Sequence, residues 1–379
     1  MKMKTVFFLI TLLSFCLNPK SMHAKSFDFR EIIQDPYESH DPSCKEDCQD
    51  PPLTFVNLED KAQDFVLESK QISIPGYLTA FNPTIIRWKN SLLLAFRIRH
   101  PVTAITNYVG LVWLDDDFNI KSQVYILDIP HQNKPLPSKL QDPRLITIND
   151  QLYMVFSDII PGTIIPEVRR VFISQIHFDG VSFIADNPEC LSKFKNEREQ
   201  RWEKNWTPFV YNNELFLSYS LSPHRILKPL PGTGSCDEFA STTNSIQWKW
   251  GVLRGGTQAF LIDNDHYLSF FHTSISMATT HSNGKLMPHY FMGAYLFSSQ
   301  PPFEIKQVSP RPIIGKGFYS GPAYKTWKPL RVVFPCGFVF DNDYIWVTYG
   351  KQDHEIWVAK IHKKKLLKSL VPVNSLQTN

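Results

Sequence analysis

The sequence has 379 residues, with 40 Lys and Arg against 36 Asp and Glu, which gives a formal net charge of +4. So balanced a charge excludes a protein whose main task is to bind nucleic acid, and 43% hydrophobic residues exclude a disordered chain. The unusual feature is an aromatic content of 13%. Aromatic side chains favour β-strands, and exposed ones favour planar or sugar ligands.

The N-terminus has the order of a secretory signal. Two lysines within residues 1–4 precede the apolar run TVFFLITLLSFCL at 5–17, and a polar stretch follows. The run is shorter than a membrane span requires. We therefore expect a cleaved signal peptide at residues 1–24 and a secreted, periplasmic or lumenal protein. The alternative is a protein that this segment anchors in the membrane.

The rest of the chain divides into an arm, a large domain and a tail. Residues 25–69 are polar and acidic and contain Pro and Cys, so we expect an N-terminal arm there. From 70 to 365, short apolar runs bounded by Asn, Asp and Gly replace helical periodicity, which indicates an all-β domain. Residues 366–379 form the expected C-terminal tail.

Five segments of the domain share one pattern: a small or polar start, a strand, a turn of the type KN, ND, NN or DND, and a second apolar strand. Asn and Asp tolerate the positive φ that tight hairpin turns need. The spacing leaves room for another hairpin in each unit, so the pattern predicts an all-β five-bladed β-propeller. An irregular β-sandwich or two β domains are the alternatives. The segments start at Asn82, Asp142, Thr207, Thr257 and Cys336.

In a propeller the first strands of the blades line the centre, so the five starts would converge there. The sharpest motif is QDPR at 141–144. Asp142 stands at a strand start, and Arg144 falls on the same side of an extended strand. A nearby cation would lower the pKa of the Asp142 carboxyl, whereas burial would raise it. The alternative is a DP turn with a surface ion pair.

Three further motifs lie at strand starts or turns. EKNWTPF at 203–209 places a charged pair and a Trp immediately before a strand, and RGGTQ at 254–258 precedes a strand that ends in His272. Paired glycines allow the backbone to approach a ligand or another chain segment closely. YGKQDH at 349–354 is typical of a polar turn between two strands.

Several catalytic motifs are absent from the sequence. It contains no HExxH, P-loop, GxSxG or paired CxxC motif. Metal-dependent hydrolysis, nucleotide hydrolysis and serine-esterase chemistry therefore lack support. We expect neither a metal ion nor another cofactor.

Taken together and in order, six segments between about Tyr77 and Ile361 resemble glycoside hydrolase family 130, the β-mannoside phosphorylases and mannosidases, and the related β-mannosyltransferase propellers. The matching pieces are FNPTII with LLLAFR (81–97), DPRLITINDQLYMVF (142–156), EKNWTPF (203–209), GGTQ with FFH (255–272), YFMGAYLFSSQPPFEI with PII (290–314) and VVFPCGFVFDNDYIWVTYGKQDHEIWVA (332–359). The resemblance implies a five-bladed propeller, in agreement with the repeat pattern.

The resemblance also implies an enzyme that cleaves or transfers β-linked mannosyl units with inversion, with Asp142 as general acid and phosphate or water as nucleophile. An anionic nucleophile needs fixed cations beside the reacting carbon. Matched positions imply that the phosphate-binding residues are Arg170, Lys204 and His272. The expected substrate-binding residues are Asn82, Arg97, Arg144, Trp206, Tyr349 and Asp353, of which the Trp and Tyr rings are placed to stack on a sugar.

Two choices stay open at this point. Hydrolysis is an alternative to phosphorolysis or transfer, with Glu203 or Glu167 as the base for water, although Lys204 and Arg170 favour a phosphate or sugar phosphate. A non-catalytic carbohydrate-binding propeller is the alternative to an enzyme. The expected partners are a β-mannoside oligosaccharide or glycan and inorganic phosphate, with no nucleic acid and no membrane beyond the signal segment.

Overall fold

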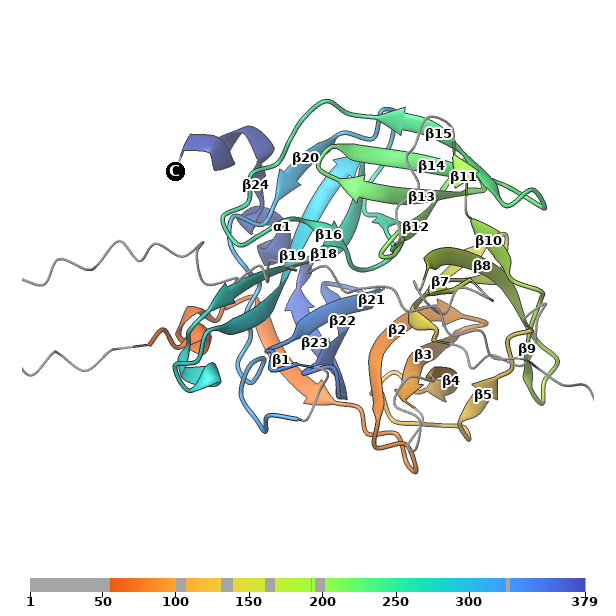
Figure 1. Cartoon of the computed structure of the whole chain (residues 1–379), viewed down its shortest axis with the longest axis horizontal. Coiled ribbons are helices and arrows are strands. Elements are labelled where there is room, and N and C mark those ends of the chain that lie inside the picture. The colour runs from red at the N-terminus through yellow and green to blue at the C-terminus, as the bar shows by residue number, and fades with distance from the viewer. Residues whose placement is uncertain are drawn as a thin grey trace, which may run out of the picture. The chain divides into compact units, whose positions relative to one another are not determined.

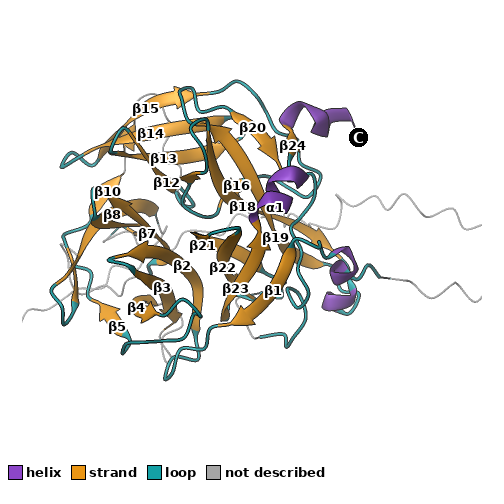
Figure 2. Ribbon diagram, turned by 180° about the vertical axis from the view of Figure 1, so that it is seen from behind, coloured by secondary structure: helices purple, strands orange, loops and turns teal. Residues whose placement is uncertain are grey.

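The computed structural model describes residues 55–99, 107–130, 139–160, 168–191, 193–194, 202–324 and 328–378. Within them, five sheets form a five-bladed β-propeller (Figures 1 and 2), which confirms the predicted fold. The expected signal peptide and most of the expected arm lie outside the described residues. No helix in the described ranges is long and apolar enough to cross a membrane.

The first four blades follow one another along the chain, each with its first strands towards the centre. The first blade contains β2 (Ala80–Trp88), β3 (Ser91–Arg99), β4 (Asn107–Leu114) and β5 (Tyr125–Leu127). The second contains β6 (Gln141–Ile148), β7 (Gln151–Ile159), β8 (Arg169–Phe178), β9 (Phe183–Ala185) and β10 (Glu189–Leu191). The third contains β12 (Thr207–Tyr211), β13 (Glu214–Leu221), β14 (His224–Leu230) and β15 (Ser235–Ser241), with β11 (Lys193–Phe194) parallel to β15. The fourth contains β16 (Arg254–Gly255), β17 (Phe260–Leu261), β18 (His266–Met277), β19 (Met287–Ser298) and β20 (Ile305–Val308).

Both ends of the described domain are tied into the sheets. The fifth blade contains β21 (Val333–Asp341), β22 (Tyr344–Lys351) and β23 (Glu355–His362), and its outer strand is β1 (Val66–Gln71). After α1 (Lys363–Ser369), β24 (Val371–Pro372) pairs with β20 of the fourth blade. The sheets therefore include residues 66–69 and 371–372, which the sequence placed in the arm and the tail. Closure by an N-terminal strand covers a sheet edge that would otherwise be exposed.

The short helices lie outside the blades. They are the 3-10 helices η2 (Leu58–Lys61), η3 (Thr280–Ser282) and η4 (Val373–Thr378). The η2 segment fixes a loop of the domain, because the Glu59 carboxylate accepts hydrogen bonds from the backbone N–H groups of Gly317, Tyr319 and Ser320. The described end of the expected arm is thus joined to the propeller by specific contacts.

The predicted hairpin turns are confirmed in the first three blades. Residues 89–90, 149–150 and 212–213 connect the first two strands of their blades, and all six have φ between 48° and 62°. Two successive residues at positive φ are the mark of a type I′ turn, whose twist matches that of the flanking strands. The Asn and Asp residues of these turns are therefore favoured by backbone conformation, although Lys89 adopts the same conformation in the first blade.

Aromatic side chains fill the spaces between neighbouring blades. Phe156 belongs to a buried cluster that joins the first and second blades, and Phe96 and Trp346 to one that joins the first and fifth. Phe216 and Phe270 lie in the cluster that joins the third, fourth and fifth blades. Full burial of such a side chain contributes roughly 1.5–3 kcal/mol. Much of the aromatic excess is therefore explained by packing between blades, as expected.

Candidate active site

Two proline-containing bulges turn side chains towards the centre of the propeller. The strand register shifts at Asn82-Pro83 in the β2–β3 pair and at Asp142-Pro143 in the β6–β7 pair. Asn82 and Asp142 have φ of 49° and 54°, which Asn and Asp tolerate better than most residues. Proline is accommodated at bulges, and bulges re-aim the neighbouring side chain. The motifs NP and DP thus bring an amide and a carboxylate from two blades together.

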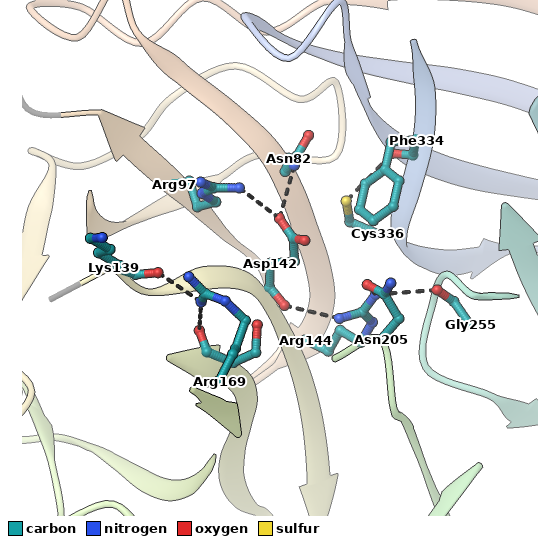
Figure 3. Close-up of polar contacts among 11 residues, drawn as sticks. Asn82, Arg97, Lys139, Asp142, Arg144, Arg169, Asn205, Gly255, Phe334 and Cys336 are labelled. Atoms are coloured by element: carbon teal, nitrogen blue, oxygen red, sulfur yellow. Dashed lines mark hydrogen bonds and ion pairs between the residues drawn. The ribbon is translucent and has the colours of Figure 1, made fainter. Parts of the chain in front are cut away.

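The Asp142 carboxylate is the meeting point of the site (Figure 3). Its Oδ1 accepts hydrogen bonds from Asn82 Nδ2 at 2.9 Å and from Arg97 Nη1 at 3.1 Å. Burial alone would raise the pKa of this carboxyl. The charges of Arg97 and Arg144 and the hydrogen bond from Asn82 outweigh burial and lower the pKa to about 2. Asp142 is therefore ionised at neutral pH and, in this state, can accept a proton.

Arg144 is a buried anchor between blades. Its Nε donates to the Gly256 carbonyl at 2.6 Å, and its Nη1 to the Asp142 carbonyl at 3.0 Å. Its Nη2 donates at 3.4 Å to the Gly255 carbonyl and to Asn205 Oδ1. These contacts connect the second, third and fourth blades. Because the guanidinium is engaged with the protein itself, its position does not support the expected contact with a sugar.

The paired glycines of the fourth blade allow chain segments to come close. A Cβ at Gly255 would lie 2.2 Å from the carbonyl oxygen of Asn205, and one at Gly256 would lie 2.5 Å from that of Phe270. Any side chain would therefore force the backbone apart. Of the two uses that the sequence suggested for the glycines, the structure shows the approach of another chain segment.

Gly350 makes room for Asn82. A Cβ at Gly350 would lie 1.9 Å from Asn82 Oδ1 and 3.1 Å from the Asn82 backbone nitrogen. Asn82 in turn donates to Asp142. Gly350 of the fifth blade therefore leaves the space in which Asn82 of the first blade can donate to the Asp142 carboxylate of the second blade.

Asp353 supplies a second carboxyl at the centre. It lies in the turn between β22 and β23 with φ of 50°. Burial raises its pKa, an effect that the Arg97 charge opposes and the Asp142 charge reinforces. The pKa values of Asp142 and Asp353 are thus displaced in opposite directions. Carboxyl pairs separated in this way are typical of sites in which one group is ionised and the other can hold a proton.

Positive charge gathers around Asp142. Burial lowers the pKa of Lys204, and the Asp142 carboxylate opposes this. Arg169 and Arg254 add to the lowering, because their charges act on Lys204 as well. An anion bound here would relieve the repulsion among like charges. Among the described side chains, no group of three His, Cys, Asp or Glu could hold a metal ion.

The strand register places Arg169 rather than Arg170 in this group of cations. Neighbouring side chains of a strand point to opposite faces. Arg169 Nη1 donates to the Lys139 carbonyl at 2.9 Å (Figure 3), and the Arg169 charge acts on Lys204. Arg170 instead acts on the Cys190 thiol of the outer strand β10. The register thus brings the charge of Arg169, which the sequence analysis missed together with Arg254, to Lys204. Arg169 is buried and donates to the Lys139 and Ser157 carbonyls, so its position, like that of Arg144, does not support a direct contact with phosphate.

His272 lies buried in β18, and its hydrogen bonding defines its tautomer. Its Nδ1 is 3.0 Å from the Gly255 carbonyl oxygen, which can only accept, so Nδ1 carries the hydrogen. Burial and then the Arg144 charge hold the pKa of His272 well below its usual range. The ring is therefore neutral, and Nε2 is an acceptor. It can accept a hydrogen bond from a hydroxyl or a protonated phosphate oxygen, but it lacks the positive charge expected of a phosphate ligand.

Trp206 and Tyr349 are core residues. The Trp206 ring packs against Phe194, and its Nε1 donates to Glu203 Oε2 at 3.3 Å. Tyr349 is fully buried, with its ring 4.9 Å from that of Phe318. Neither ring is open to a ligand, so their positions do not support the expected stacking on a sugar. The pattern of strand starts and turns predicted their neighbourhood but could not predict the direction of their side chains.

Solved structures with the same fold include enzymes that act on mannosides. Neither a protein-family model nor a curated protein sequence matches this chain. The β-1,2-mannobiose phosphorylase of Listeria innocua is similar in structure, with 14% identity, a TM-score of 0.54, and coverage of 85% of this chain and 98% of that one. A mannose phosphorylase of Leishmania mexicana, solved with a phosphate ion, has 12% identity, a TM-score of 0.54 and coverage of 83% and 93%. A GDP-Man-dependent mannosyltransferase of Leishmania mexicana has 12% identity, a TM-score of 0.52 and coverage of 79% and 91%. The likeness shows the shared propeller fold.

Proposed function

We propose that this protein is an enzyme that moves a mannosyl unit between a β-mannoside and a phosphate, with inversion, and that Asp142 transfers the proton. The observation that carries the proposal is an ionised, buried Asp142 held by Arg97 and Asn82 beside a group of cations. The fold shared with a β-1,2-mannobiose phosphorylase, a mannose phosphorylase and a mannosyltransferase supports mannosides as substrates.

The chemistry proposed for the site is a single displacement. In the direction of cleavage, the bond from the anomeric carbon to the glycosidic oxygen breaks while a phosphate oxygen bonds to that carbon from the opposite face. The departing oxygen needs a proton, which the protonated form of Asp142 supplies in this direction. In the direction of synthesis, the acceptor hydroxyl loses its proton to the Asp142 carboxylate. Because the pKa of Asp142 is about 2, the unliganded site already holds the base for synthesis, whereas cleavage requires Asp142 first to take up a proton.

The residues divide between the sugar and the anion. Asn82 and Arg97 donate hydrogen bonds to Asp142. Asp353 interacts electrostatically with Arg97 and Asp142. Asn82, Arg97 and Asp353 are therefore proposed to hold the reacting mannose. Lys204 and Arg254 are proposed to hold the phosphate, and the buried Arg169 adds its positive charge from beneath them. Fixed cations stabilise the charge that passes between phosphate and sugar, since they need no reorientation during the reaction.

Hydrolysis is less well supported. Of the two bases suggested for water, Glu203 is buried and accepts a hydrogen bond from the Trp206 indole, and Glu167 lies outside the described residues. A site that activated water would also gain little from a group of cations. A non-catalytic carbohydrate-binding propeller is the remaining alternative, and it predicts binding of a mannoside without any product.

Product analysis separates these functions. Purified protein is incubated with β-mannobiose isomers, with and without phosphate. Mannose 1-phosphate formed only with phosphate supports the proposal, and free mannose in both samples supports a hydrolase. Asp142→Asn keeps the shape and the tolerance of positive φ. It should remove turnover while the mannoside still binds, and unchanged turnover would contradict the role given to Asp142.

The proposed place of action is outside the cytosol. The basic, apolar and polar order of residues 1–24 supports a secreted, periplasmic or lumenal protein. Determining the N-terminus of the protein recovered from its native host tests this. A mature chain that starts near residue 25 is expected, and an intact N-terminus would favour the membrane-anchored alternative.

A further inference from the structure

Phe81 is a buried aromatic residue that packing between blades does not account for. It lies in β2, directly before the bulge at Asn82, and it is only 1% exposed. Among the described side chains it belongs to none of the buried apolar clusters. Phe96 of the neighbouring strand β3, by contrast, lies in the cluster that joins the first and fifth blades. The Phe81 ring therefore has another role in the structure.

Two guanidinium groups lie over the Phe81 ring. The guanidinium carbon of Arg97 is 4.5 Å and that of Arg99 is 4.9 Å from the ring centroid. The strand register explains this arrangement. Phe81 stands directly opposite Arg97 in the β2–β3 pair, and Arg99, two residues further on, shares the same face of β3. The face of an aromatic ring is negative and attracts such cations, most strongly where water is excluded.

The Arg97 side chain has few other contacts that fix its position. Among the described residues, the 3.1 Å contact with Asp142 is its one side-chain hydrogen bond, and its Nε is buried without a partner. A buried charge is costly unless its surroundings compensate for it. One carboxylate oxygen and the face of the Phe81 ring provide this compensation, so the ring limits where the Arg97 guanidinium can lie.

Arg99 increases the need for the ring. Burial lowers the pKa of Arg99, and the Arg97 charge lowers it further, so the two guanidinium groups repel each other. Both lie against the same ring, whose negative face offsets part of this repulsion. With an aliphatic side chain in place of Phe81, the repulsion would be less well opposed, and the contact of Arg97 with Asp142 would loosen.

We propose that Phe81 is a positioning residue, whose ring holds the Arg97 guanidinium against the Asp142 carboxylate by the attraction of its face for the cation. The inference rests on the proposed function, in which Asp142 transfers the proton. Phe81 also directly precedes Asn82, the other residue that donates to Asp142 (Figure 3). One short segment of β2 thus contributes to both hydrogen bonds that hold the carboxylate. The effect of Phe81 on the reaction passes through Arg97.

Other titratable or charged groups also interact with Asp142, and replacing Phe81 leaves all of their side chains in the protein. They are Arg144 of β6, Lys204 before β12, His272 of β18, Tyr290 of β19, Cys336 of β21 and Asp353 of the turn between β22 and β23. Burial raises the pKa of Asp142, and Arg97 is the strongest of the cations that oppose this effect. Loosening Arg97 should therefore raise the pKa of the Asp142 carboxyl.

Removing the aromatic face tests the proposal. Phe81→Leu keeps an apolar side chain but has no ring. In this variant the acid limb of the kcat/KM profile for mannosyl transfer should move to higher pH, and kcat at neutral pH should fall by about tenfold. Phe96→Leu is the matched control, because it makes the same change at a buried residue next to Arg97 that points to the opposite face of β3. It should also lower stability but should leave the limb in place.

A second variant keeps the ring and nearly its shape. A ring-fluorinated phenylalanine in place of Phe81 has less electron density on the face of the ring, so its attraction for cations is weaker. This variant should move the acid limb in the same direction as Phe81→Leu, by a smaller amount. NMR titration of the Asp142 carboxyl carbon in the unliganded protein measures the effect without any reaction. The pKa of Asp142 should rise in both Phe81 variants and stay unchanged in Phe96→Leu.

Several outcomes would overturn the proposal. An equal shift in Phe96→Leu would show that any loss of packing has this effect, and a shift in Phe81→Leu without one in the fluorinated protein would show that the ring acts through its volume alone. If mannose 1-phosphate forms but neither the limb nor the pKa of Asp142 moves in the Phe81 variants, the inference fails and the proposed function stands. If this pKa rises in both Phe81 variants but no mannoside is converted, the inference stands and the proposed function fails.

Discussion

Arg97 Nη1 and Asp142 Oδ1 are 3.1 Å apart, and this ion pair joins the first blade to the second at the centre of the propeller. The two side chains are only 11% and 12% exposed. In such surroundings the pair decides the protonation state of Asp142, because Arg97 is the strongest of the contacts that lower the pKa of this carboxyl. The proposed function depends on that state.

Replacing Arg97 should shift the pH dependence of turnover. In Arg97→Gln the pKa of Asp142 should rise from about 2, because the cation that outweighs burial is gone. The acid limb of the kcat/KM profile for mannosyl transfer should therefore move to higher pH. Arg87→Gln, which breaks the exposed pair with Asp116, is the matched control and should leave the limb in place. An unmoved limb in Arg97→Gln would show that Asp142 does not carry the proton.

The Arg97–Asp142 ion pair should also make the free energy of unfolding depend on pH in the acidic range. The pKa of Asp142 is lowered from 3.8 in the unfolded chain to about 2 in the folded one. Its contribution, about 2 kcal/mol, is therefore complete above about pH 4 and is lost as the pH falls through 2. Urea unfolding between pH 5 and pH 2 should show a steeper loss of stability for the wild-type protein than for Asp142→Asn. Parallel curves for the two proteins would contradict the lowered pKa.

Replacing Arg144 should mainly lower the stability of the protein, whereas replacing Lys204 should mainly lower its affinity for phosphate. Arg144→Ala removes the donor to the Gly256 and Asp142 carbonyls and leaves the buried Asp142 carboxylate with one cation fewer, so it should reduce the free energy of unfolding by about 3 kcal/mol or more. Lys204→Ala removes a cation that makes no such backbone contacts in the described structure. It should change the free energy of unfolding by less than about 1 kcal/mol and reduce the affinity for phosphate. Thermal unfolding and phosphate titration of both variants test this, and equal destabilisation by the two changes would contradict it.

Gly350→Ala should disable the site without removing any of its polar groups. The added Cβ would collide with Asn82 Oδ1, so Asn82 must move away from Asp142. Turnover should fall by about tenfold or more, since removing one well-placed hydrogen bond to a reacting group has effects of this size. In an Asn82→Ala background, Gly350→Ala should cost little more, because the colliding atom is already absent. Additive losses in this double-mutant cycle would show that Gly350 acts elsewhere.

The parts of the fold that were predicted correctly have local causes. The KN, ND and NN turns need positive φ, and the residues that tolerate it stand in the sequence at regular places. The propeller follows from their repetition. The role of β1 could not be predicted in this way. β1 pairs with β23 at the other end of the domain, and a pairing between segments so far apart in the sequence leaves no local pattern in residues 66–71.

The sequence predicted the residues around Asp142 correctly but not which of the neighbouring cations and aromatic rings face the site. Asp142 and Asn82 belong to motifs in which a bulge fixes the direction of the side chain, so their convergence could be expected. The choice between Arg169 and Arg170 depends on the register of one strand by a single residue, which exchanges the two faces of the sheet. Trp206 likewise lies in an irregular segment before β12, where no periodic pattern tells whether its ring is buried.

The anomeric configuration of the product tests the central claim most directly. β-1,2-Mannobiose and phosphate are incubated with the wild-type protein and with Asp142→Asn, and the sugar phosphate is identified by NMR spectroscopy. The account predicts α-mannose 1-phosphate from the wild-type protein, by inversion at the anomeric carbon, and none from the variant. A β-configured product, or a product that forms equally well without the Asp142 carboxylate, would contradict it.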